Sequence, residues 1–107
     1  MNPKLAPLKA GDTFSYAGTC KLPAGLWTAT CEVRTWDGAS TLIGTVAVTL
    51  GTEVSGETPI ALYAAASATA TWPVATHEVD IRYADAGGVV VHSSTMLLPV
   101  VQSITGA

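Results

Sequence analysis

Residues 27–36, Trp-Thr-Ala-Thr-Cys-Glu-Val-Arg-Thr-Trp, alternate between apolar or small side chains and polar ones. The apolar face consists of Trp27, Ala29, Cys31 and Val33, and the polar face of Thr28, Thr30, Glu32 and Arg34. A period of two residues predicts a β-strand that buries one face and leaves the other in water. This stretch therefore indicates a sheet with one covered side.

Residues 76–83 repeat the same design further along the chain. Their inward positions are Val79, Ile81 and Tyr83, and their outward positions are Glu78, Asp80 and Arg82. Similar patterns predict strands over residues 12–20, 42–50, 58–63, 89–91 and 95–104. Pro99 cannot donate a ladder hydrogen bond, so it indicates an edge position or a break in the last strand.

About seven short strands within about 100 residues predict an all-β sandwich with antiparallel pairing. Residues 64–71, rich in alanine, predict one short helical turn that ends at Trp72-Pro73. The sequence predicts a flexible N-terminal segment over residues 1–10 and a single β-sandwich domain over residues 11–107.

Charged residues form only 12% of the 107 residues, about half the share of an average globular domain. Threonine, with 15 copies, fills many outward strand positions instead. A net charge of −3 without a basic cluster argues against a nucleic-acid partner. The two longest uncharged stretches contain prolines and many hydroxyl groups, so no membrane span is expected. The N-terminus lacks the apolar core of a signal peptide, which favours a cytoplasmic product.

Two cysteines, Cys20 and Cys31, leave two states open. Pro23-Ala-Gly25 predicts a turn between two strands, and a hairpin centred near Gly25 places the two cysteines about opposite each other. A cross-strand disulfide then becomes geometrically feasible. Reducing cytosol favours free, buried thiols instead.

Three stretches carry a resemblance to a known group of proteins. They are Leu22–Gly25 with the strand to Arg34, Ala65–Pro73 with the strand Glu78–Tyr83, and Asp85–Val90 with the last strand. Together they resemble the small immunoglobulin-like β-sandwich proteins of bacteriophage and prophage structural gene clusters, including N-terminal domains of baseplate proteins. The resemblance spans about residues 11–105. It implies an immunoglobulin-like fold and a virion or assembly role in the tail, neck or baseplate, and it brings no active site.

No catalytic, metal-binding or cofactor-binding constellation is expected from the residues themselves. His77 and His92 are the only histidines and lack the spacing of a zinc site; we expect both at the rim or edge of the sheets. Cys31 lies on an inward face, where a thiol acts as a small hydrophobe rather than a nucleophile. The sequence therefore predicts a protein that is not an enzyme.

A polar outward face is the candidate interface. Its members are Arg34, Trp36, Glu78, Asp80 and Arg82. If their two strands share a sheet, the charged residues form a cross-strand ladder, for which a solvated surface is the ordinary interpretation. The outward position of Trp36 and the frequency of arginine at interfaces favour an assembly surface instead.

The leading hypothesis is a non-enzymatic phage or prophage structural or assembly protein. It would dock to other phage structural subunits, with repeated copies arranged by symmetry, in the bacterial cytoplasm during assembly and then in the virion. The alternative hypothesis is a secreted immunoglobulin-like binding or adhesion module that stacks carbohydrate on Trp36 or Tyr63. A signal sequence upstream or an oxidised cysteine pair would favour the alternative.

Overall fold

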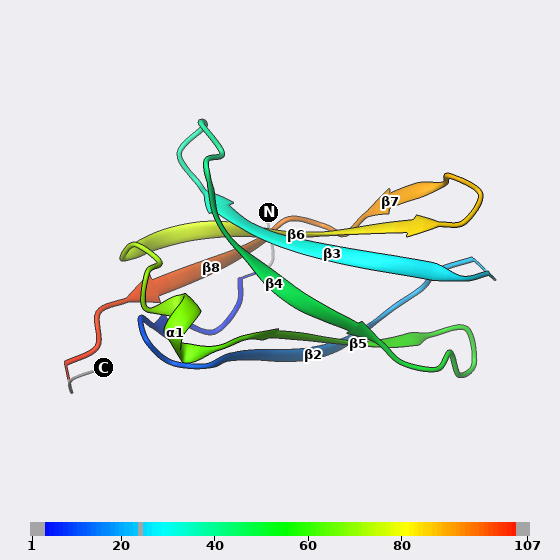
Figure 1. The fold of residues 1–107 in the computed structure, drawn as a ribbon, viewed down its shortest axis with the longest axis horizontal. Helices are drawn as coiled ribbons and strands as arrows, with labels where there is room; N and C mark the ends of the chain where they lie inside the picture. Colours follow the sequence, from blue (N-terminus) through cyan, green and yellow to red (C-terminus); the bar gives the residue numbers. More distant parts are fainter. Residues whose placement is uncertain (1–3, 24, 105–107) are drawn as a thin grey trace.

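A computed structural model of the protein describes residues 4–23 and 25–104 and shows an all-β fold with one short helix (Figure 1). The elements are β1 (Leu8–Lys9), β2 (Phe14–Cys20), β3 (Trp27–Thr35), β4 (Leu42–Leu50), β5 (Thr58–Ala64), α1 (Ala66–Thr69), β6 (Ala75–Asp85), β7 (Val90–His92) and β8 (Met96–Val101). Every strand expected from the sequence is present, and the helix is shorter than the predicted range.

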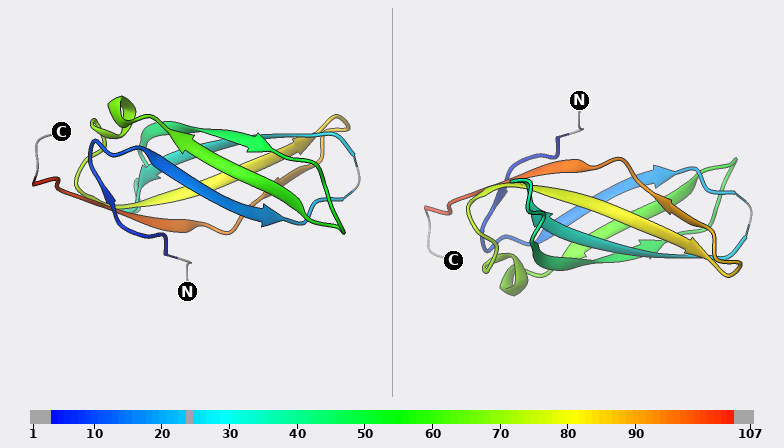
Figure 2. Two further views of the ribbon diagram at one scale, coloured as in Figure 1. Left: turned by 90° about the horizontal axis from the view of Figure 1, so that it is seen from below. Right: turned by 90° about the horizontal axis from the view of Figure 1, so that it is seen from above.

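Among the described residues, the strands form one hydrogen-bonded path in the order β1-β8-β6-β3-β4-β5-β2, with β7 paired to β6. The path folds into two layers because β4 changes partner along its length. Residues 42–46 of β4 pair with β3, whereas residues 47–50 pair with β5. Figures 1 and 2 show β3, β6 and β8 in one layer and β2 and β5 in the other, with β4 crossing between them.

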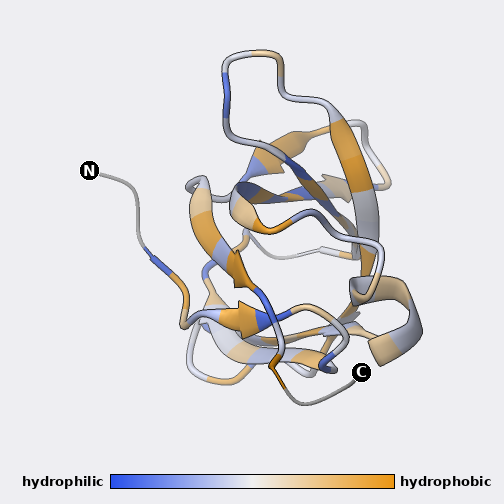
Figure 3. Cartoon of the chain, turned by 90° about the vertical axis from the view of Figure 1, so that its left-hand side faces the viewer, coloured by the Kyte–Doolittle hydropathy of each residue, from blue (hydrophilic) through white to orange (hydrophobic). Residues whose placement is uncertain are grey.

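The core lies between the two layers and contains the inward positions predicted from the alternating pattern. Figure 3, seen from the α1 end, shows hydrophobic stretches on strands of both layers. The buried apolar residues include Phe14, Cys31, Val33, Val46, Ile60, Leu62, Val79, Ile81, Tyr83, Leu98 and Val100. Removing these side chains from water supplies the main driving force for folding.

Trp72 closes one end of the core. It is 3% exposed, and its ring centroid lies 6.3 Å from that of Phe14. Gly44 in β4 makes this packing feasible, since a Cβ there would lie only 2.7 Å from Nε1 of Trp72. The helix is held in place by the Thr69 hydroxyl, which donates to the Asp12 carbonyl at 2.6 Å. Trp72 thus fills the core near the short helix.

Two predictions were wrong, one about a hairpin and one about a histidine. The segment Cys20–Cys31 is not a hairpin: β2 pairs with β5, while β3 pairs with β4 and β6, because the connection between β2 and β3 passes from one layer to the other (Figure 1). The turn residue Ala24 lies outside the described residues.

His77 is not at the rim, since it is 1% exposed and its Nε2 lies 2.7 Å from the Pro73 carbonyl oxygen. The Pro73 carbonyl, which precedes β6 in the chain, thus provides a hydrogen-bond partner for the buried ring.

Residues 4–10, which the sequence predicts as flexible, lie along β8. Lys4 forms a parallel bridge with Leu97, and Leu8 and Lys9 pair with Val100 and Val101. Leu8 is buried in this arrangement. Residues 1–3 of the predicted flexible segment lie outside the described residues. Strand β8 is therefore second from the end of the sheet, with only the two-residue β1 beyond it, which is consistent with Pro99 within it.

In the described part of the chain, no helix has the length and apolar character needed to span a membrane.

Candidate functional site

The candidate interface residues of β3 and β6 do share a sheet face. The two strands are antiparallel neighbours with a continuous register from Trp27 opposite Asp85 to Thr35 opposite His77. In this register the outward pairs that contain a charged residue are Arg34 with Glu78, Glu32 with Asp80, and Thr30 with Arg82. The polar ladder was predicted on the condition that the two strands share a sheet, and they do.

The Arg34 guanidinium pairs along its own strand rather than across to Glu78. Its Nη2 and Nε donate to Oε1 of Glu32 at 2.8 and 3.0 Å, and its Nη1 donates to the Ser40 carbonyl at 2.9 Å. The Ser40 hydroxyl in turn donates to Glu78 Oε1. Ser40 adopts a positive φ of 52°, which is uncommon for a residue with a side chain. Ser40, in the loop after β3, therefore links the two side chains: its carbonyl accepts from Arg34 and its hydroxyl donates to Glu78.

Asp80 is held by the segment that follows β7. The Ser93 hydroxyl lies 3.2 Å from Asp80 Oδ1 and accepts the backbone N–H of Ile81 at 3.0 Å. Arg82, by contrast, is exposed, and the Arg34–Glu32 pair is the one ion pair found within residues 4–23 and 25–104. Arg82 is thus the cation of this face left available to an incoming group.

These side chains line a shallow concavity of about 320 Å³ on the outer face of the β3–β6 layer. The lining residues are Thr30, Glu32, Arg34, Ser40, Glu78, Asp80, Arg82, His92 and Thr95. The strand pattern indicated Arg34, Glu78, Asp80 and Arg82. It missed Ser40 and Thr95, which lie in connections, because alternation gives no information about how a loop folds onto a sheet.

Trp36 directly follows β3, on a loop that side-chain hydrogen bonds hold in place. Its side chain is 53% exposed. The Thr35 hydroxyl donates to Asp37 Oδ1 at 2.8 Å and accepts the N–H of Thr41 at 2.9 Å. The Thr35 hydroxyl and the Ala39 N–H hold the pKa of the Asp37 carboxyl below its usual value. A large aromatic surface is therefore presented to solvent on a loop with defined geometry. The lining of the concavity does not include it.

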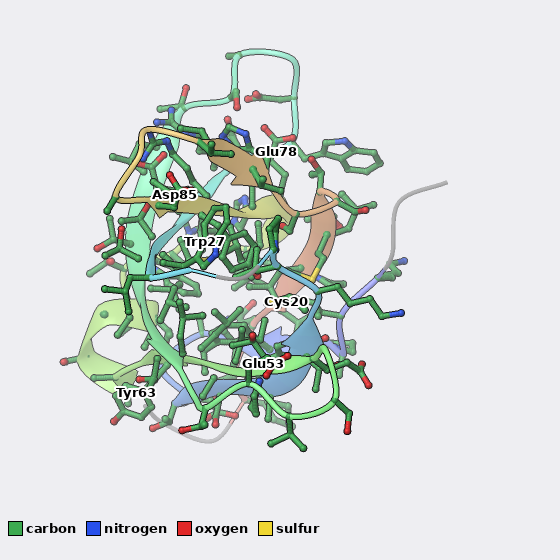
Figure 4. The ribbon with its side chains drawn as sticks, turned by 90° about the vertical axis from the view of Figure 1, so that its right-hand side faces the viewer. Cys20, Trp27, Glu53, Tyr63, Glu78 and Asp85 are labelled. Atoms are coloured by element: carbon green, nitrogen blue, oxygen red, sulfur yellow. The ribbon has the colours of Figure 1, made fainter. Side chains whose placement is uncertain are left out.

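A second hollow opens between the two layers, at the margin where β2 and β7 approach. This groove encloses about 310 Å³ and is lined mainly by apolar groups, among them Ile60, Ile81, Tyr83, Val91 and Met96. Burial, followed by the contact with the Cys20 thiol, raises the pKa of the Tyr83 phenol. In Figure 4 Cys20 lies at this margin, whereas Glu78 and Tyr63 point outward from opposite layers. Sequence reasoning did not identify the groove, because its walls come from strands distant in the chain.

The two cysteines and the two histidines differ in burial. Cys20 and Cys31 are both free thiols, in line with the favoured sequence expectation. Burial raises the pKa of the Cys31 thiol to about 12, and the Asp80 and Glu32 carboxylates add to the effect, so Cys31 stays protonated at neutral pH. His92 is exposed, whereas the buried His77 has an Nδ1 atom without a hydrogen-bond partner. No cluster of three metal-ligating side chains occurs in the described parts of the chain.

Comparison with known proteins assigns no family to this chain. No protein-family model matches it, and no curated protein matches it significantly. The resemblance to phage β-sandwich proteins therefore stays a prediction from the sequence, and the functional account depends on the geometry of the surfaces just described.

Proposed function

We propose that this protein is a non-enzymatic structural or assembly subunit of a bacteriophage or prophage virion, which acts by docking to other virion subunits. It would be present in the bacterial cytoplasm during assembly and then in the tail, neck or baseplate. The observation that carries the docking role is strand β7, an edge strand with all three residues exposed. Val90 and Val91 are 42% and 38% exposed there. Strand β7 contains no Asp, Glu, Lys or Arg, the residues that would disfavour pairing with another strand.

The strand order supports an immunoglobulin-like sandwich as the scaffold. Strands β2, β5 and the second half of β4 form one layer, and β3, β6 and β8 form the other. Immunoglobulin-like domains divide their strands between two sheets in a similar order, whereas here β1 joins β8 and β4 links the two layers. Such domains commonly serve as binding modules, and the resemblance seen in the sequence adds the virion context.

The outer face of β3 and β6 is the second proposed docking surface. Arg82 offers an available cation, Glu78 and Asp80 offer carboxylates, and the exposed Trp36 follows the end of β3. Arginine and tryptophan are enriched where interfaces bind most tightly. The low charge of the remaining surface lowers the cost of covering it, since fewer ions lose their hydration.

The proposal is tested by measuring binding to the capsid and tail proteins encoded beside this gene. We expect at least one of them to bind, and Arg82→Glu or Trp36→Ser to weaken the complex about tenfold or more. Tyr63→Ser is the matched control, because Tyr63 is 52% exposed, against 53% for Trp36, but lies in β5 of the other layer. A gene neighbourhood without capsid, tail or terminase genes would contradict the virion role.

The alternative proposal, a secreted carbohydrate-binding module, draws on the same two exposed aromatic rings. Aromatic side chains with one open face can stack on a sugar ring, and Trp36 and Tyr63 are both about half exposed. This function predicts binding to immobilised glycans that is lost in Trp36→Ser or Tyr63→Ser. Glycan binding together with no affinity for virion subunits would favour it over the docking proposal.

A further inference from the structure

The groove between β2 and β7 lies on a sheet margin that is only partly covered. Along this margin, the segment from Lys4 to Lys9 runs beside β8, bridging Leu97 and pairing with Val100 and Val101. In the described part of the chain, nothing pairs with the outer edge of β7, which is hydrogen-bonded to β6 alone. One half of the margin is therefore closed by a short parallel strand, and the other half is open.

The backbone of β7 presents hydrogen-bonding groups to solvent at alternate residues. The Asp85 N–H donates a hydrogen bond to the Val89 carbonyl, and the Ser93 N–H donates one to the Ile81 carbonyl. In the antiparallel register between these two bonds, Val91 forms the hydrogen-bonded pair with Tyr83. The N–H and C=O groups of Val90 and His92 therefore point away from β6, roughly 7 Å apart along the strand.

The side-chain geometry beside this edge suits apolar residues. Val91 lies opposite the buried Tyr83, so its side chain faces the groove, where Ile60, Ile81 and Met96 also form the lining. A strand added to β7 would place every second side chain over these residues. Among the lining residues, Lys21 is the one Lys, Arg, Asp or Glu, which favours a partner with a carboxylate at that end.

We propose that this groove accepts an extended segment of another virion subunit, which hydrogen-bonds to Val90 and His92 and places alternate apolar side chains in the groove and an acidic residue near Lys21. The inference deepens the proposed docking function and depends on it for the identity of the partner. The pairing of β1 with β8 supplies the precedent, because the incoming segment continues the same row of strands along the same margin. Strand addition of this kind takes affinity from the backbone and specificity from alternate side chains.

The direct test attaches such a segment to the full chain. Valine and threonine alternate in the added segment, a glutamate ends it, and a Gly-Ser linker of about eight residues, with a reach of roughly 16 Å, joins it to the N-terminus. Tethering gives an effective concentration in the millimolar range, so even modest affinity is detected. We expect amide hydrogen exchange at Val90 and His92 to slow by about tenfold or more compared with the untethered chain.

Proline variants of β7 separate strand addition from other effects of the tether. His92→Pro removes an outward N–H without removing a bond to β6, and His92→Ala is the matched control that keeps the N–H. We expect the tether to protect the Val90 amide in His92→Ala but not in His92→Pro. If His92→Pro does not fold, Val90→Pro and Val90→Ala make the same comparison, with the His92 amide as the reporter.

Two outcomes would overturn the inference. One is unchanged exchange at Val90 and His92 in the tethered chain, and the other is equal protection in the proline and alanine variants. Either result leaves docking through the Trp36 and Arg82 face intact. A tethered segment that binds, combined with no affinity for any virion subunit, would instead preserve the groove and contradict the proposed virion function.

Discussion

Strands β8 and β7 lie along the same margin of β6, yet one is core and the other is surface. The inward residues of β8, Met96, Leu98 and Val100, are 9%, 0% and 2% exposed, whereas Val91, the inward residue of β7, is 38% exposed. Both strands are rich in aliphatic residues, so composition does not explain the difference. The neighbouring elements explain the difference, because β1 pairs with β8, whereas an open groove borders β7. An apolar strand left at an open edge is the kind of feature that a partner covers.

The largest expected effect is at the closed end, where Trp72 fills the core. Trp72→Ala should lower the free energy of unfolding by about 3–5 kcal/mol, because a large buried ring is lost and Phe14 loses its packing partner. Urea unfolding measures this change. Trp36→Ala is the matched control at an exposed tryptophan, and we expect it to cost under about 1 kcal/mol. Equal losses in the two variants would contradict the assignment of Trp72 to the core.

The covered and open halves of the margin can be compared by truncating one aliphatic residue in each. Leu98→Ala in β8 should cost about 2–5 kcal/mol, because it leaves a cavity between the layers. Val91→Ala in β7 should cost about 1 kcal/mol or less, because its side chain already meets solvent. A similar loss in both variants would mean that the two halves of the margin are equally buried.

A smaller effect concerns alkaline pH. The buried Cys31 has a pKa of about 12, raised from 9.0, so its folded-state advantage is complete below pH 9 and is lost as the pH rises toward 12. Between pH 7 and pH 10, the wild type should lose about 1.4 kcal/mol of unfolding free energy relative to Cys31→Val. Urea titrations at the two pH values give this difference. If the wild type and Cys31→Val differed by the same unfolding free energy at both pH values, the thiol would not be shielded from ionisation.

The smallest effect is predicted for the ion pair on the outer face. Arg34 and Glu32 are 40% and 45% exposed, so Glu32→Gln should change the free energy of unfolding by about 0.5 kcal/mol or less. Raising the salt concentration should leave the comparison with wild type nearly unchanged. A loss above about 2 kcal/mol would indicate that the pair supports the fold rather than a binding surface.

Local patterns predicted the strands and their inward faces well, because alternation is a property of each segment. The turn at Asp85–Gly88 follows from its glycines, whereas the pairing of β3 with β6 was only a condition of the predicted ladder, because a shared period does not determine the partner strand. The course of β4 did not follow, since the alternation at Val46, Val48 and Leu50 does not show that the partner strand changes from β3 to β5. The mistaken Cys20–Cys31 hairpin has the same origin, because a turn motif does not show whether a chain stays in one layer.

The candidate site was predictable only where it consists of strand residues. The alternation of side chains along β3 and β6 places four of the predicted residues on one face: Arg34, Glu78, Asp80 and Arg82. Ser40 reaches Glu78 through a loop with a positive φ, which no alternation predicts. His77 was misplaced because the backbone of Pro73, not a strand, covers it. The assignment of the groove to a partner strand similarly depends on tertiary structure.

The central claim, an open edge on β7 beside a covered β8, is tested most directly by amide hydrogen exchange in the free protein. We predict that the Val90 and His92 amides exchange nearly as fast as in an unfolded chain, while the Val91 amide, bonded to Tyr83, exchanges much more slowly. Protection of Val90 and His92 equal to that of Val91 would contradict the claim, because it would show that the edge is already occupied.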